Sequence, residues 1–119
     1  MEISHGAIVL VSAPGEPDSG ARQGPKSAPT RPGVIVQADL FNESHGTITL
    51  CPLTDVIGGE ALFRVAISPQ EHTGLPVECE VQVDRITSVQ RHRIVKVIGH
   101  ASATRMEQVD QALRRWLAL

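Results

Sequence analysis

Two stretches decide the fold: residues 30–39, TRPGVIVQAD, and residues 47–55, TITLCPLTD. Each contains a run of β-branched and aliphatic residues, which is typical of a buried strand. The first begins with Arg31 and Pro32, and proline restricts the backbone on both sides of itself, so a cation is fixed at the mouth of that strand. The second ends with a hydroxyl, that of Thr54. A cation and a hydroxyl donor on one rim suit a site that handles a phosphate.

Shorter strand-like runs surround these two stretches. Strands are predicted at residues 6–12, 33–38, 47–53, 61–67, 79–84, 85–89 and 93–98, with a long Pro/Gly-rich loop at 13–30. Residues 68–77 are rich in turn formers and are expected to hold one helical turn.

The C-terminal segment predicts a helix. Thr104 and Glu107 have the spacing of a capping box, which makes Thr104 the expected N-cap. An apolar stripe follows at three- and four-residue steps, formed by Met106, Val109, Leu113, Trp116 and Leu117. The fold class is therefore mainly β with a C-terminal helix, as a strongly bent sheet or small barrel.

Length and composition narrow the class of protein. With 119 residues, 41% hydrophobic and 20% charged, the chain is expected to form one domain over residues 1–119. No apolar run approaches the ~20 residues of a membrane span, and the acidic start does not resemble a signal peptide, so the expected location is cytoplasmic. Cys51 and Cys79 lack metal-type spacing and are expected to be reduced and buried.

Several kinds of chemistry are not supported by the motifs. The five histidines form no HxxxH or HxH pair and none lies near a cysteine, so no metal site and no cofactor are predicted. Phosphate-binding loops, a nucleophile elbow and the common nucleic-acid modules are also missing. Aromatic residues make up only 3% of the chain, so any nucleic-acid contact must depend on Arg, Lys and backbone groups.

The order of motifs along the chain closely resembles the PemK/MazF family of toxin–antitoxin endoribonucleases. The resemblance covers nearly the whole sequence and is carried by GAIVLV, TRPGVIVQAD, TITLCPLT, TGLPVECEVQVDRITSV, RIVKVIG and the C-terminal MEQVDQALRRWLAL. It implies a small SH3-like or CcdB-like β-barrel with short added helices. It also implies a homodimer, metal-independent and sequence-specific cleavage of single-stranded RNA (mRNA), and a cognate antitoxin that blocks the RNA site.

The resemblance also assigns roles to residues. In the family the arginine of the Arg-Pro pair and the threonine that ends the second strand are functional, and here they are Arg31 and Thr54. Asp84 occupies the place of an acidic residue that contributes to substrate handling. Gln82 and Arg85 flank Asp84 and are expected to contact RNA.

The first loop departs from the family pattern. Relatives commonly carry a G-x-E-Q element before the Arg-Pro pair, but here Arg22 replaces the carboxylate and Gln23 follows it. This puts in doubt a loop carboxylate as general base. It also makes Arg22, Gln23 and Lys26 expected RNA contacts. Glu16, Asp18 and His45 are the other candidate bases, and the sequence selects none of them.

Two other functions stay open on the sequence. A toxin of the same fold could bind DNA gyrase without being an enzyme, or the chain could be a degenerate module that binds only its antitoxin. The discriminating feature is the Arg31–Thr54 pair, which a gyrase poison would not require. An acidic antitoxin segment could bind a basic face formed by Arg85, Arg91, Arg93 and Lys96.

Overall fold

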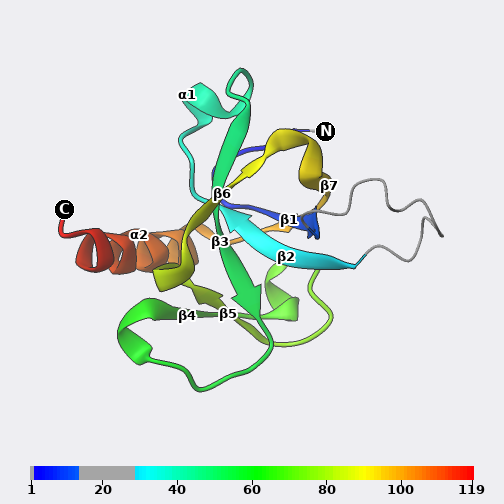
Figure 1. The fold of residues 1–119 in the computed structure, drawn as a ribbon. Helices are drawn as coiled ribbons and strands as arrows, with labels where there is room; N and C mark the ends of the chain where they lie inside the picture. Colours follow the sequence, from blue (N-terminus) through cyan, green and yellow to red (C-terminus); the bar gives the residue numbers. More distant parts are fainter. Residues whose placement is uncertain (1, 14–28) are drawn as a thin grey trace.

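Seven antiparallel strands make one sheet in the part of the chain that the structure describes, and a helix packs against it (Figure 1). The structure is a computed structural model that describes residues 2–13 and 29–119. The strands are β1 (Ala7–Ser12), β2 (Thr30–Ile35), β3 (Thr47–Thr54), β4 (Arg64–Ile67), β5 (Cys79–Gln82), β6 (Thr87–Gln90) and β7 (Ile94–His100). The helices are α1 (Asp39–Asn42) and α2 (Ala103–Leu117), with 3₁₀ turns η3 (Ala61–Phe63), η4 (Pro69–Glu71), η5 (Val83–Arg85) and η6 (Arg91–Arg93).

The sheet is strongly bent but open. Its strands follow the order β4-β5-β3-β2-β1-β7, and β6 pairs with β3 beside β5. Within the described residues no ladder joins β4 to β7, so the sheet curls without closing into a complete barrel. The mainly β fold with a C-terminal helix is confirmed, while the word barrel fits only loosely.

The edge of β3 that receives β5 and β6 contains an irregularity that shapes the site. Leu53 pairs with Val81 and Leu50 pairs with Thr87. Residues 82–86 therefore lie opposite only residues 51 and 52 of β3. The extra residues of this segment form the 3₁₀ turn η5, so the strand predicted at 79–84 ends at Gln82.

Both faces of the central strands are buried. Val34 belongs to the core cluster that includes the α2 residues, whereas its neighbour Ile35 belongs to a second cluster that contains no residue of α2. Leu50 and Cys51 divide in the same way. This double burial explains why the strands read as continuous apolar runs rather than as alternating patterns.

Helix α2 begins two residues earlier than the sequence predicts. Ser102 is the N-cap, and its hydroxyl accepts a hydrogen bond from the backbone N–H of Arg105 at 3.1 Å. The prediction of Thr104 is wrong because a serine upstream already satisfies a free N–H of the first turn. Met106 and Val109 are buried as expected, but Trp116 is 45% exposed and packs edge-on against Phe63.

The short helices and the two cysteines can also be compared with the sequence predictions. The short helix α1 is not foreseen by the sequence, whereas the turn expected in residues 68–77 is η4. Both cysteines are free and buried, as predicted. Among the described residues, no helix has the length and apolar character needed to cross a bilayer.

Candidate functional site

A cavity of about 1020 Å³ lies where β2 begins and β3 ends. Its polar lining comes from the strand ends and from η5: Thr30, Arg31, Thr54, Asp55, Gln82, Arg85 and Thr87. An apolar wall faces them, formed mainly by Leu10, Leu75, Pro76, Val77 and Ile98. The cavity therefore combines charged hydrogen-bond donors with a surface that can cover a flat apolar group.

Strand pairing explains why Arg31 and Thr54 meet at this cavity. The last β2–β3 pair is Gly33 with Pro52, and the same register continued by two residues sets Arg31 opposite Thr54. Pro32 has no N–H to extend the ladder, so β2 leaves β3 at this point while it remains paired with β1. Figure 1 shows the start of β2 and the end of β3 diverging. The two predicted catalytic residues thus occupy the mouth created by this separation.

Two guanidinium groups supply the positive charge of the cavity. Arg31 lies at the start of β2 and Arg85 in η5, and both side chains are exposed. Neither donates a hydrogen bond to, or forms an ion pair with, any of the described residues. Guanidinium donors of this kind can bind two phosphate oxygens at once.

The Thr54 hydroxyl is held in place by the loop that follows it. Thr54 Oγ1 accepts a hydrogen bond from the backbone N–H of Val56 at 3.1 Å. This contact uses an acceptor site of the hydroxyl, while its O–H has no acceptor among residues 2–13 and 29–119. The hydroxyl can therefore donate to a ligand in the cavity.

The residues around η5 have different positions. Gln82 and Arg85 line the cavity, but Asp84 between them does not. Asp84 Oδ1 is buried and has no hydrogen-bond partner in the described part of the chain. The negative charge of Asp84 is also one cause, after burial, of the raised pKa of the Cys51 thiol. Asp84 is half-buried with Oδ1 shielded from solvent, and the expected contact of its carboxylate with substrate remains a prediction.

Asp55 is the functional candidate that the sequence reasoning missed. It follows Thr54 directly, is exposed, and is the one carboxylate among the described residues that line the cavity. His45, considered as a base, precedes β3, so the full eight-residue strand, about 25 Å long, separates it from Thr54. The adjacency of a strand-end threonine and an aspartate in PLTD is the signal that could have identified Asp55.

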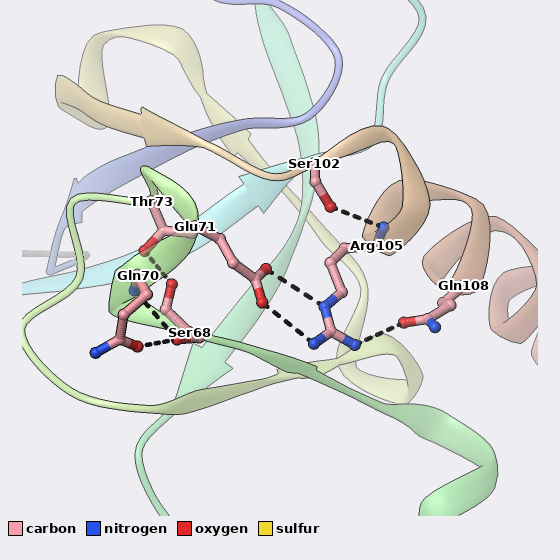
Figure 2. A network of polar contacts seen from close by, with 7 residues as sticks. All are labelled: Ser68, Gln70, Glu71, Thr73, Ser102, Arg105 and Gln108. Atoms are coloured by element: carbon pink, nitrogen blue, oxygen red, sulfur yellow. Dashed lines mark hydrogen bonds and ion pairs between the residues drawn. The ribbon is translucent and has the colours of Figure 1, made fainter.

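A polar network fixes the apolar wall (Figure 2). Glu71 in η4 accepts two hydrogen bonds from Arg105 of α2, at 3.3 and 3.2 Å, and Arg105 also donates to Gln108 at 3.2 Å. Thr73 donates to the Ser68 carbonyl at 2.9 Å. These contacts hold residues 68–73 against α2. They therefore fix the position of the part of the apolar wall that follows, beginning at Leu75.

Two glycines allow this segment to cross β7 closely. A Cβ on Gly74 would lie 2.0 Å from the Ile98 carbonyl oxygen, and one on Gly99 would lie 2.2 Å from the Thr73 backbone. Gly74 also has a φ of +75°, which side chains rarely adopt. The segment and the strand can pack at this distance only because neither residue has a side chain.

The other predicted contacts belong to the first loop and to the basic face. Arg22, Gln23 and Lys26 of the loop lie outside the described residues. In the expected basic face, Arg91 donates to the His45 carbonyl at 2.7 Å and Arg93 to the Ser12 carbonyl at 2.7 Å. These two arginines therefore hold the fold together in addition to contributing surface charge.

A smaller hollow of about 310 Å³ lies between β4 and α2. Its arginines already have protein partners, since Arg64 pairs with Glu80 and Arg115 donates to the Leu62 carbonyl. The described residues contain no group of three or more metal-binding side chains. The cavity at the strand ends is therefore the stronger candidate site.

Comparison with known proteins supplies a family for this arrangement. The family model of the PemK-like, MazF-like toxin of type II toxin–antitoxin systems matches residues 4–117. Endoribonuclease MazF9 of Mycobacterium tuberculosis is 34% identical over 107 residues, which is 86% of this chain and 90% of that protein. Endoribonuclease MazF6 of the same species is 29% identical over 103 residues, with 86% and 90% covered.

Solved structures share the fold. MazE–MazF from Deinococcus radiodurans aligns with a TM-score of 0.78 at 21% identity, covering 100% of this chain and 98% of that one. An endoribonuclease in complex with its cognate antitoxin from a mycobacterial species aligns with a TM-score of 0.75 at 18% identity, covering 98% and 95%.

Proposed function

The chain belongs to the PemK-like, MazF-like family of type II toxin–antitoxin toxins, and from this premise we propose that it is a metal-independent endoribonuclease that cuts single-stranded RNA sequence-specifically to arrest growth. The observation that carries the proposal is the cavity in which Arg31 and Thr54 lie together at the ends of paired strands. The gyrase-binding alternative is not favoured, because the family model and the relatives are those of MazF-like toxins and endoribonucleases.

Cleavage without a metal uses the ribose 2′-hydroxyl as the nucleophile toward phosphorus. Negative charge then grows on the phosphoryl oxygens, and fixed donors that bind it stabilise the transition state. Arg31 is suited to this role because its guanidinium stays protonated and can hold two oxygens, and Thr54 adds a neutral donor. Asp55 can accept the proton of the 2′-hydroxyl while its oxygen forms a bond to phosphorus. The bond between phosphorus and the 5′-oxygen breaks, and the departing 5′-oxygen takes a proton from water, which leaves a 2′,3′-cyclic phosphate and a 5′-hydroxyl.

Substrate binding is assigned to the other lining groups. Arg85 and Gln82 contact the neighbouring phosphate and base, and the apolar wall covers a base face. Arg22, Gln23 and Lys26 of the first loop also contact RNA, and Asp84 contributes to substrate binding.

The proposal also covers the binding partners of the protein and its location in the cell. A cognate antitoxin blocks the cavity, in keeping with related toxins whose structures contain MazE or a cognate antitoxin. The toxin, a single unit over residues 1–119, acts as a homodimer in the cytoplasm, where its RNA substrate is found.

The test is cleavage of a long single-stranded RNA by purified protein in EDTA. The wild type should cut at defined sites, and Arg31→Ala should cut at least about 100-fold more slowly. Arg114→Ala is the matched control, since Arg114 is equally exposed but lies on α2 away from the cavity. Uncut RNA together with DNA breaks in expressing cells would support the gyrase alternative instead.

A further inference from the structure

The loop that follows Thr54 is closed over one carboxylate. Glu80 Oε2 accepts a hydrogen bond from the Gly58 N–H at 3.1 Å, and Oε1 accepts one from the Gly59 N–H at 3.3 Å. Arg64 Nη1 donates to the same Oε1 at 2.9 Å. These donors hold the pKa of Glu80 below its ordinary value, chiefly through the Gly58 N–H. The carboxylate is thus ionised and satisfied by the loop at neutral pH.

The two glycines are shaped for this contact. Gly58 has a φ of +100°, and a Cβ on Gly59 would lie 2.4 Å from Arg64 Cζ. The loop backbone therefore packs directly on the guanidinium that pairs with Glu80. Such close packing gives the loop one defined path even though Val56 and Ile57 are 71% and 56% exposed.

This contact leads back to Thr54 by two routes. Thr54 and Glu80 are cross-strand partners in the β3–β5 ladder, so their side chains are neighbours on one face. The loop held by Glu80 also supplies the Val56 N–H that binds Thr54 Oγ1. Because that N–H occupies an acceptor site of the hydroxyl, the path of the loop determines where the Thr54 O–H can point.

We propose that Glu80 is a positioning residue for the reaction: by binding the Gly58 and Gly59 amides it fixes the loop whose Val56 N–H orients the Thr54 hydroxyl. This role rests on the proposed cleavage of RNA. Glu80 is not among the residues that line the cavity. Its effect on the rate therefore passes through Thr54.

A double-mutant cycle separates this role from a general structural one. Glu80→Ala should lower kcat about 10- to 100-fold with little change in KM, since misplacing one donor weakens transition-state binding. The loss should not exceed that of Thr54→Val, which removes the hydroxyl. In the Thr54→Val background, Glu80→Ala should have no further effect on kcat. The control is Glu78→Ala, an exposed carboxylate two residues away that should leave kcat unchanged.

Amide hydrogen exchange gives a readout independent of activity. Gly58 and Gly59 should exchange faster in Glu80→Ala than in the wild type or in Glu78→Ala, while β3 amides keep their protection. Glu80→Gln, which keeps the side-chain volume and one acceptor oxygen, should give a smaller effect and serves if the alanine variant does not fold.

The outcomes distinguish the two proposals. Wild-type protein that leaves RNA intact overturns the proposed function and the positioning role together. If the wild type cuts RNA but the Glu80→Ala and Thr54→Val losses multiply, or Gly58 and Gly59 exchange is unchanged, the positioning role alone is overturned.

Discussion

The buried thiol of Cys51 predicts a measurable loss of stability at alkaline pH. Cys51 has 0% exposure, and burial, with a smaller effect from the Asp84 charge, raises its pKa from 9.0 to about 12. An unfolded chain releases this proton near pH 9, whereas the folded chain retains it until about pH 12. Between these pH values ionisation of the thiol lowers the free energy of the unfolded state but not that of the folded state. The free energy of unfolding therefore falls as pH rises.

The size of the effect follows from the two pKa values. Between pH 8 and pH 10 the free energy of unfolding should fall by about 1.4 kcal/mol through Cys51 alone, because each pH unit above the unfolded pKa contributes about 1.36 kcal/mol. The chain has no tyrosine, but burial also raises the pKa of the Cys79 thiol, so the share of Cys51 must be isolated by substitution.

Urea unfolding under reducing conditions at both pH values measures the loss, with Cys51→Ala as the comparison. The alanine variant should lose about 1.4 kcal/mol less than the wild type over this interval, whatever constant offset its smaller side chain introduces. Cys79→Ala should keep the Cys51 effect. Parallel pH curves for the wild type and Cys51→Ala would refute the reasoning.

Three further predictions concern packing, capping and RNA binding. Gly99→Ala should destabilise the fold by about 1–3 kcal/mol in thermal or urea unfolding, because its Cβ meets rigid Thr73 backbone at 2.2 Å. Ser102→Ala should cost about 0.5–2 kcal/mol through loss of the α2 cap, whereas Thr104→Ala should cost less. Arg85→Ala should make the salt dependence of binding to a non-cleavable 2′-deoxy-substituted RNA shallower by about 0.7 in log–log slope, and an unchanged slope would mean that Arg85 contacts no phosphate.

The strands could be predicted because their residues are locally decisive. The runs around Val34 and Cys51 are rich in apolar and β-branched residues, and both faces of these strands are in fact buried. Element ends were less predictable. The strand starting at Cys79 stops at Gln82 because η5 interrupts its pairing with β3, and pairing depends on residues far away in the sequence.

Some residues of the candidate site could likewise be predicted from local sequence, and others could not. Arg31 and Thr54 could be placed together because Arg31 directly precedes Pro32 and Thr54 lies two residues after Pro52, and both positions are strand ends that can be recognised locally. The shielding of Asp84 Oδ1 from solvent could not be predicted, since it depends on how η5 turns between β5 and β6. Asp55 was missed because an aspartate after a strand is usually a turn residue. Its adjacency to Thr54 is a weak signal, and the cavity shows that it lines the site.

The two prolines of the motif stretches explain why the site lies where it does. Pro32 lies where β2 stops pairing with β3, and Pro52 lies where β3 has no partner between β5 and β6. Neither proline interrupts a ladder at the edge that is left unpaired there, so it costs the observed sheet little. Pro32 also prevents the β2–β3 ladder from extending past Gly33 and closing the opening of the cavity.

Exchanging Pro32 for a residue with an N–H would allow β2 and β3 to pair as far as Arg31 and Thr54. The two side chains would then move together, and the space between them would become smaller. The sequence that interrupts the sheet is therefore also the sequence that opens the cavity.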